Sequence, residues 1–353
     1  MSKDNVKDLI TQMKAAVKSA QNTQASQTAP RPSAAPAART PAAAPAGASS
    51  AAEGADSPAV LALINELMTG VETRFGIKPG SLVERKLVRI LKDMPIAILR
   101  DWISSMNSCS SEHSEWQSLV ENLTVHETYF CRDPDLMGML ADEILPSLIA
   151  SRESHQQLQV WSAASSTGEE VYDLAYTCMR GLHKAGKARQ YDGNKLAPDR
   201  GWSLYVLGTD ISNQALRTAR EAVYGDLGMG SFRNLPDTWK GMFEEVTIPP
   251  ANAMAGVNYF KIREWVRQCT RFERFNLMNS RPPVQRMDLV FCRNVLIYFE
   301  DAVKRAVQIM LARSMSQGGV LVMGASVQML APEYFESRLG KGGPWYIRNG
   351  VPV

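Results

Sequence analysis

The sequence is poor in the residues that build metal centres and disulfide frameworks. Its 353 residues include five cysteines and four histidines, and no C-x-x-C pair. An odd number of irregularly spaced cysteines argues against both a disulfide scaffold and a zinc knuckle. At this length we expect two or three folding units and a core that is stable without a metal. The cysteines are Cys109, Cys131, Cys178, Cys269 and Cys292.

Charge of one sign is also scarce. The 39 basic side chains are nearly balanced by 36 acidic ones, which leaves a net charge of +3. A chain with this balance lacks the broad cationic surface that binds phosphate backbones, so we expect no nucleic acid among its partners.

Long hydrophobic runs are missing as well. No uninterrupted apolar stretch reaches the roughly 18 to 20 residues that cross a bilayer, and the opening MSKDNVKDLI carries charges where a signal peptide is apolar. We therefore expect no membrane insertion and a cytoplasmic location.

The first 57 residues differ in composition from the rest. Residues 21–57 contain 14 Ala and 5 Pro in 37 positions, and no aromatic residue precedes Phe75. Such a segment cannot bury enough surface to offset its ordering entropy, so we predict a disordered linker over 21–57. Residues 1–20 place Val6, Leu9, Ile10, Met13 and Val17 on one helical face. They predict a short amphipathic helix, which is either a docking segment or a frayed terminus, because an isolated helix this short is marginal in water.

Residues 58–124 show a different pattern. Apolar positions recur there at intervals of three and four, as at Leu61, Ile64, Leu67 and Met68. This spacing predicts a small all-helical domain of three or four helices.

After that region, short apolar strands alternate with helices. This order is typical of βαβ units in a parallel sheet, so the fold class is α/β. The predicted strands are Leu158–Ala163, Leu204–Thr209, Met287–Phe291 and Val320–Met323, and the predicted helices are Glu169–His183, Ser212–Ala222 and one after Phe299. Residues 186–201 are polar, and we predict a surface loop there. The alternation in Tyr259–Ile262 and Thr270–Phe275 predicts a small antiparallel insert over about residues 225–275.

The turn after the first predicted strand consists of small residues. Ala164-Ser165-Ser166-Thr167-Gly168 leads into Glu169 and Glu170 at the start of a helix. Ligands bind at this edge of an open α/β sheet, but the turn is not G-x-G-x-x-G and no Lys follows Gly168. The pattern therefore favours a nucleoside without a pyrophosphate. The alternative is that the two glutamates only stabilise the helix N-terminus.

An acidic residue closes the second predicted strand. Asp210 is placed to accept hydrogen bonds from ribose hydroxyls, or else to act as the N-cap of the following helix. About 40 residues separate the turn from this acid, more than the usual 20 or so.

Three longer segments stand out together: HETYFCRDP (126–134), WSAASSTGEEVY (161–172) and FCRNVLIYF (291–299). As a set they resemble the bacterial chemotaxis receptor methyltransferases of the CheR type, which carry NET-x-FFR, WSA-x-x-STGEEPY and FCRN-x-x-IYF in this order. The resemblance covers about residues 58–348. It implies a Rossmann-like class I methyltransferase sheet over 125–353, dependent on S-adenosylmethionine (SAM), with the insert as its β-subdomain.

The resemblance also implies an activity. Members of that family methylate glutamate side chains of membrane chemoreceptors, giving glutamyl methyl esters and S-adenosylhomocysteine. The partner would be the cytoplasmic domain of a chemoreceptor. Carried over by position, the cofactor contacts are His126, Thr128, Arg132, Glu169, Asp210, Asn276, Leu277, Cys292 and Arg293.

The same comparison implies that Arg132 and Tyr298 face the reacting centre as catalytic residues. Without it, Arg132 could simply cap a loop and Tyr298 could be a buried aromatic. His126 stands where the family has Asn. Two other functions remain open: a SAM-binding regulator with little turnover, and a methyltransferase for RNA or a small metabolite, which the low net charge disfavours.

Overall fold

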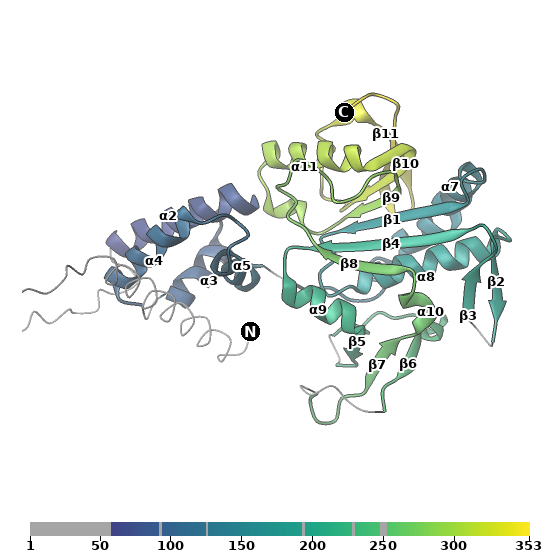
Figure 1. Ribbon diagram of the computed structural model, residues 1–353, viewed down its shortest axis with the longest axis horizontal. Helices are drawn as coiled ribbons and strands as arrows, with labels where there is room; N and C mark the ends of the chain where they lie inside the picture. The colour runs from purple at the N-terminus through teal and green to yellow at the C-terminus, as the bar shows by residue number, and fades with distance from the viewer. Residues whose placement is uncertain (1–57, 92–93, 125, 193–194, 228–229, 248–252) are drawn as a thin grey trace, which may run out of the picture. The chain divides into compact units, whose positions relative to one another are not determined.

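The computed structural model describes residues 58–91, 94–124, 126–192, 195–227, 230–247 and 253–353 (Figure 1). The predicted helix over 1–20 and the predicted linker over 21–57 lie outside these residues. The described chain divides into two compact units, one of residues 58–74 and 78–123 and one of residues 75–77 and 124–353. In this described part, no helix is long and apolar enough to cross a bilayer.

The first unit is all-helical, as the apolar spacing predicted. Its helices are α2 (Pro58–Phe75), α3 (Ser81–Leu91), α4 (Ile96–Ser108) and α5 (Ser114–Leu123). Trp116 is fully buried, and its indole Nε1 donates a 2.8 Å hydrogen bond to the carbonyl oxygen of Met106. Gly70 approaches this ring so closely that a Cβ would lie 2.6 Å from it. Burying a side chain of this size stabilises a small core by about 3 to 5 kcal/mol relative to alanine.

The second unit is built on a seven-stranded sheet in the order β11-β12-β10-β9-β1-β4-β8. Strands β10, β9, β1, β4 and β8 are parallel, and the β11–β12 hairpin adds the antiparallel edge. Figure 1 shows β9, β1 and β4 side by side at the centre. The strands are β1 (Gln157–Ala163), β4 (Ser203–Asp210), β8 (Thr270–Arg274), β9 (Met287–Cys292), β10 (Met315–Met323), β11 (Phe335–Gly340) and β12 (Gly343–Arg348).

Helices connect the parallel strands in the predicted order. β1 leads through α8 (Glu169–Lys184) to β4, β4 through α9 (Asn213–Glu221) to β8, and β9 through α11 (Asp301–Ser314) to β10. The first two crossovers proceed along the sheet in one direction and the third in the other. The sheet therefore reverses its order between β1 and β9, which is where open α/β sheets bind ligands. The other helical segments here are α6 (Pro134–Met139), η1 (Leu140–Ile144), α7 (Leu145–Ser151), η2 (Asp237–Met242), α10 (Glu264–Arg267), η3 (Leu296–Tyr298) and η4 (Pro332–Tyr334).

Two of the sequence-based assignments were wrong. Thr270–Phe275 does not belong to the insert, because β8 pairs in parallel with β4 at the edge of the main sheet. Its alternating pattern arises since an edge strand is only half covered. Residues 186–201 are not merely a loop, because β2 (Ala188–Tyr191) and β3 (Lys195–Pro198) form an antiparallel hairpin there.

The antiparallel insert itself has three strands. β5 (Val223–Gly225), β7 (Tyr259–Ile262) and β6 (Phe243–Glu245) pair in the order β5-β7-β6. Phe130, in the segment before α6, packs on this insert, because its ring lies edge-on to Tyr224 and Phe243 at centroid distances of 5.0 and 4.9 Å. Edge-to-face aromatic pairs add about 0.5 to 1.5 kcal/mol beyond the area that they bury.

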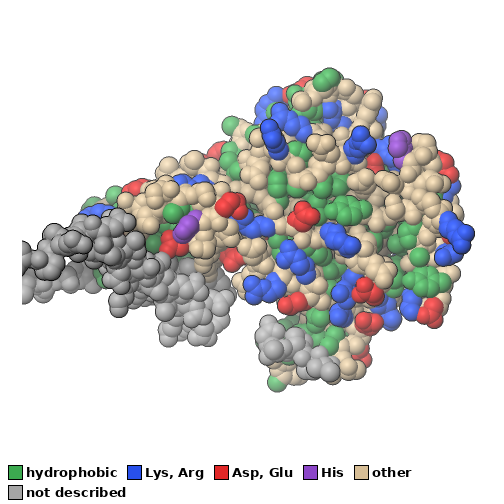
Figure 2. Space-filling view, viewed as in Figure 1, with side chains coloured by type: hydrophobic (Ala, Val, Ile, Leu, Met, Phe, Trp, Pro, Cys, Tyr) green, Lys and Arg blue, Asp and Glu red, His purple; other side chains and the backbone are tan. Residues whose placement is uncertain are grey.

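Basic and acidic side chains are interspersed on the face that Figure 2 shows. This distribution agrees with the near balance of charge in the sequence.

Candidate methyl-transfer site

The turn between β1 and α8 has an unusual backbone. Ala164 and Ser166 have φ values of 66° and 50°, and Gly168 has φ 96°. Only glycine adopts such values without a steric cost. The turn is held because the Ser165 N–H donates to the carbonyl of Thr209 at 2.8 Å and the Ser166 N–H donates to Asp210 Oδ2 at 2.8 Å. The first two parallel strands are thus joined at their carboxyl ends.

Asp210 ends β4 and is 6% exposed. Its second oxygen, Oδ1, accepts the N–H of Ser212 at 2.9 Å. The interpretation of Asp210 as a helix N-cap was wrong, since the cap of α9 is Ser212, whose hydroxyl accepts from Ala215 N. Each carboxylate oxygen has two lone pairs, so both retain acceptor capacity for a ligand.

Glu169 is the first residue of α8 and is only 2% exposed. Its carboxylate accepts hydrogen bonds from the hydroxyls of Thr167 at 2.6 Å and Ser231 at 2.8 Å. Burial raises the pKa of this carboxyl, and the two hydroxyls oppose that shift. A carboxylate that only stabilises a helix N-terminus can do so while exposed to solvent. The burial of Glu169 is therefore not explained by the capping alternative alone.

The segment that carries Arg132 runs beside α8. Arg132 Nη1 donates to the carbonyl of Glu127 at 2.6 Å, and its guanidinium lies 5.6 Å from the centre of the Tyr129 ring. The side chain is partly exposed. Arg233 lies closer to the same ring, at 3.6 Å, and pairs with Glu127 at 2.9 Å.

The predicted residues after β8 and at the end of β9 lie at the same edge of the sheet. Asn276 and Leu277 follow β8 and are 4% and 8% exposed, and the preceding Phe275 N–H donates to the carbonyl of Asp210. Cys292 is fully buried. Burial raises the pKa of its thiol, and the negative charge of Glu170 raises it further. The neutral thiol fits a small filler better than a nucleophile.

Arg293 joins three parts of this unit. Its Nη1 donates to Glu170 Oε2 at 3.1 Å, and its Nη2 donates to Asp133 Oδ2 at 3.2 Å. Glu170 also accepts from the Ser162 hydroxyl at 2.8 Å. Glu170, Asp133 and Ser162 were not among the predicted site residues. The available signal was a second acid, next to Glu169, at the start of the helix.

The remaining predicted residues are less closely joined. The carbonyl of His126 accepts from the Ser166 hydroxyl at 3.4 Å, and its ring Nε2 lies 2.8 Å from Thr124 Oγ1. Thr128 lies on the segment before Arg132 and is partly exposed. Tyr298 ends η3 and is partly exposed, not the buried aromatic of the alternative interpretation. Among the described contacts, its hydroxyl makes no hydrogen bond to another predicted site residue.

The residues at this edge fit a nucleoside-containing cofactor. The Ser165 hydroxyl is buried, and within the described structure it has no hydrogen-bond partner. It lies in the small-residue turn beside Asp210, where a polar group of a ligand would satisfy it. Across the described ranges, no group of three His, Cys, Asp or Glu side chains is arranged to bind a metal.

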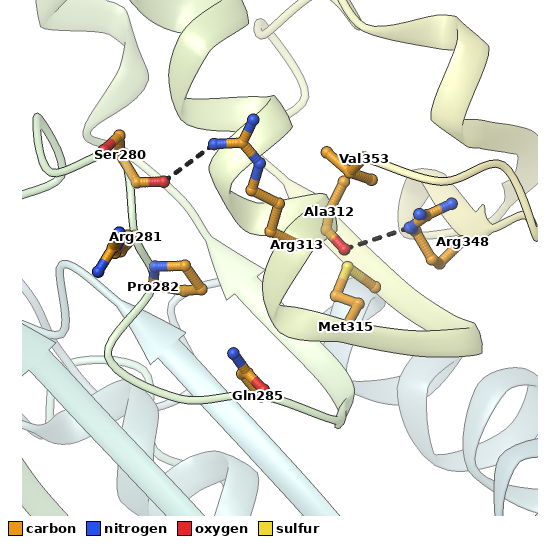
Figure 3. Close-up of a pocket in the computed structure, with 9 residues that line it drawn as sticks. All are labelled: Ser280, Arg281, Pro282, Gln285, Ala312, Arg313, Met315, Arg348 and Val353. Carbon is orange, nitrogen blue, oxygen red and sulfur yellow. Dashed lines mark hydrogen bonds between the residues drawn. The ribbon is translucent and has the colours of Figure 1, made fainter.

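A separate pocket of about 670 Å³ lies at the opposite end of the sheet (Figure 3). It is lined by the loop before β9, the end of α11, the start of β10, the end of β12 and the C-terminal Val353. Arg348 is directed at backbone carbonyls there, including that of Ala312 at 3.2 Å. None of the predicted site residues lines this pocket, so it is distinct from the methyl-transfer site.

A mostly parallel α/β sheet with a small-residue turn after β1 and an acid at the end of β4 is an arrangement in which open sheets bind nucleoside-containing ligands. Residues 126–341 match the family described as "CheR methyltransferase, SAM binding domain".

Several named relatives agree with this match. A "Chemotaxis protein methyltransferase" of Vibrio parahaemolyticus is 31% identical over 262 residues, covering 72% of this chain and 85% of that protein. "Chemotaxis protein methyltransferase 1" of Vibrio cholerae is 34% identical over 208 residues, covering 59% and 66%. A protein of the same name from Pseudomonas aeruginosa is 28% identical over 261 residues, covering 72% and 86%. The chain belongs to the CheR methyltransferase family, and its cofactor is SAM.

Proposed function

We propose that this methyltransferase esterifies glutamate side chains in the cytoplasmic domain of chemoreceptors, in sensory adaptation. The observation that carries the proposal is the anchoring of the Arg132 segment against α8 and β9, next to the strand ends that carry Asp210 and Cys292. The names of the relatives supply the substrate class.

The proposed acceptor needs no general base. A glutamate carboxylate has a reference pKa of about 4.3 and is already ionised at neutral pH. The acceptor oxygen has to approach the methyl carbon in line with the bond that breaks. Alignment of this kind lowers the barrier by about 7 to 11 kcal/mol. Bound SAM supplies the electrophilic methyl group.

Arg132 is proposed to hold the acceptor. A guanidinium fork recognises a planar carboxylate better than an ammonium does. Binding both oxygens tightly would stabilise the ground state and slow the reaction, so we expect one oxygen to remain free. Tyr298 is partly exposed after β9, and we propose that its hydroxyl orients the acceptor from the other side.

The proposed cofactor contacts come from the ends of β1, β4, β8 and β9 and from the Arg132 segment. Asp210 would accept from the ribose hydroxyls, and the buried Ser165 hydroxyl lies beside it. The other proposed contacts are His126, Thr128, Arg132, Glu169, Asn276, Leu277, Cys292 and Arg293.

A base-lability assay tests the proposed function. The purified chain is incubated with methyl-labelled SAM and receptor-containing membranes, and the product is treated with alkali. A carboxyl methyl ester releases volatile methanol, whereas an N-methyl product does not. Absence of any incorporation, with cofactor binding intact by calorimetry, would instead favour a SAM-binding regulator.

Residues 1–20 are proposed to dock the enzyme at receptor arrays. Deleting residues 1–57 and repeating the assay with membranes and with a soluble receptor fragment tests this role. A docking function predicts slower transfer to membranes and an unchanged rate with the soluble fragment. Equal rates on membranes for both chains would exclude recruitment.

A further inference from the structure

Both neighbours of Arg132 are fixed to the body of the sheet unit. On one side, the Cys131 N–H donates to Asp173 Oδ2 at 2.8 Å. On the other side, Asp133 accepts from Arg293, which is itself paired with Glu170. Arg132 thus lies between two polar anchors that both lead to α8, while its own side chain stays partly exposed.

Asp173 is an unusual residue for its position. It lies one helical turn after Glu169 in α8 and is 2% exposed, so its carboxyl group is enclosed by the protein. Burial raises the pKa of its carboxyl well above the ordinary value, and the charges of Glu170 and Glu169 add to this shift, whereas Arg293 opposes it. A residue with this desolvation cost stabilises the fold poorly by itself.

The group that Asp173 binds is equally unusual. Cys131 has φ 51°, in the left-handed region that side chains other than glycine rarely adopt. A backbone held in such a region persists only where its surroundings over-determine it. The hydrogen bond from the Cys131 N–H to Asp173 is the contact that fixes this turn. The second oxygen of Asp173, Oδ1, has no partner in the described structure.

The second anchor lies on the other side of Arg132. Asp133 is the N-cap of α6, and its Oδ1 accepts from the Leu136 N–H at 3.3 Å. Its other oxygen binds Arg293, whose side chain is 7% exposed. α6 therefore starts at a point that Arg293, just after β9, fixes, and the backbone of Arg132 lies between the two anchors.

We propose that Asp173 is a positioning residue for methyl transfer, which holds the Cys131 amide in its left-handed conformation and so directs the Arg132 guanidinium at the acceptor carboxylate. This inference rests on the proposed function, because it assigns Asp173 an effect through Arg132. It explains why a buried acid is kept beside two other carboxylates at the start of one helix.

The test compares Asp173→Ala with Asp173→Asn in the full chain, using labelled SAM and receptor-containing membranes. The alanine variant loses the acceptor, so we expect kcat to fall by roughly 10²-fold, the effect of displacing a positioning group by about 1 Å. The KM for SAM should change little. The asparagine oxygen can still accept the Cys131 N–H, so kcat should recover to within roughly tenfold of the wild type.

Asp288 provides a matched control. It is also a buried acid, 4% exposed, that accepts a backbone N–H, that of Gln159 at 2.8 Å, and it pairs with Arg152 at 2.5 Å. It lies at the start of β9, at the end of the strand away from Cys292. Asp288→Ala should lower stability while leaving kcat per folded molecule unchanged. A wild-type kcat in Asp173→Ala, or an equal loss in Asp288→Ala, would overturn the proposal.

Amide hydrogen exchange separates this inference from the proposed function. Loss of the anchor should accelerate exchange at Cys131 in Asp173→Ala but not in Asp173→Asn or Asp288→Ala. If the wild type forms no ester on receptors, the proposed function fails, yet exchange still decides whether Asp173 fixes this turn. Unchanged exchange at Cys131 in Asp173→Ala would overturn the anchoring itself.

Discussion

Arg293 Nη1 lies 3.1 Å from Glu170 Oε2, although 123 positions separate the two residues in the sequence. The contact joins the end of β9 to the first turn of α8, on the two sides of the point where the strand order reverses. Since Arg293 also binds Asp133, one guanidinium fixes the relative positions of three segments at the proposed site. A side chain that makes such contacts serves the fold and the chemistry together.

Arg293→Ala should therefore lower stability as well as cofactor affinity. Only 7% of the Arg293 side chain and 16% of the Glu170 side chain are exposed, so removal of the cation leaves a largely buried carboxylate unpaired. We expect the free energy of unfolding in urea to fall by about 3 kcal/mol.

Two further variants check this reasoning. The pair Arg305 and Glu333 has side chains 44% and 40% exposed, so Arg305→Ala should lower stability much less than Arg293→Ala. Glu170→Gln, added to Arg293→Ala, should restore part of the lost stability. Equal losses for Arg293→Ala and Arg305→Ala would contradict the role of burial.

Arg132→Ala should separate chemistry from cofactor binding. Its guanidinium is partly exposed and bonded within the described chain only to the Glu127 carbonyl, so the fold depends on it little. We expect kcat with receptor membranes to fall by roughly 10²-fold or more, because the acceptor is no longer aligned. Calorimetry with S-adenosylhomocysteine should show a modest loss of affinity. Arg233→Ala removes the neighbouring cation from the same Tyr129 ring and serves as the control, with a kcat near that of the wild type.

Gly168→Ala should damage the turn between β1 and α8. Gly168 has φ 96°, and a Cβ there would lie 2.8 Å from the Cβ of Ala219 and 3.1 Å from its Cα. The left-handed conformation costs about 1 to 2 kcal/mol and the overpacking about 1 to 3 kcal/mol more. Thermal unfolding and calorimetry with S-adenosylhomocysteine measure both effects.

Gly186 is the matched control at the other end of α8. It has φ 70°, but a Cβ there would meet no atom within 4 Å. Gly186→Ala should therefore show only the conformational cost and leave cofactor affinity unchanged. A larger loss at Gly186 than at Gly168 would show that packing against Ala219 is unimportant.

The order of strands and helices could be predicted from the sequence because it depends on local pattern. Buried parallel strands such as β9 are largely apolar runs. α8 begins a few residues after β1, and α9 begins a few residues after β4. Because the carboxyl ends of parallel strands share one edge, the 164–168 turn and Asp210 could be placed together from the pattern, whereas Asn276 and Cys292 came only from the family resemblance. The β8 strand was misassigned, because at an edge it alternates like an antiparallel strand.

The polar contacts could not be predicted in this way. The bond from Cys131 to Asp173 spans 42 positions, and it depends on a left-handed turn that no residue type in HETYFCRDP signals. The hairpin of β2 and β3 was missed because three of the four residues of β2 are exposed, so it has no apolar face to reveal it. Tertiary packing determines these features.

Glu169→Gln should raise stability at neutral pH while weakening cofactor binding. Burial raises the pKa of Glu169 in the folded state, so between the unfolded and folded pKa values the native state binds more protons than the unfolded state. The free energy of unfolding then decreases as pH rises, from about pH 4 upward, and the penalty is fully present above the folded pKa. Glutamine removes this penalty, and its amide can still bond the hydroxyls of Thr167 and Ser231. Urea unfolding between pH 4 and 8 should show the wild type losing stability relative to the variant as pH rises.

The control is Glu244→Gln, at an exposed position. Its free energy of unfolding should follow that of the wild type across this pH range. A variant that is less stable than the wild type at pH 8 would mean that the Glu169 carboxylate is held for the fold, not for the cofactor.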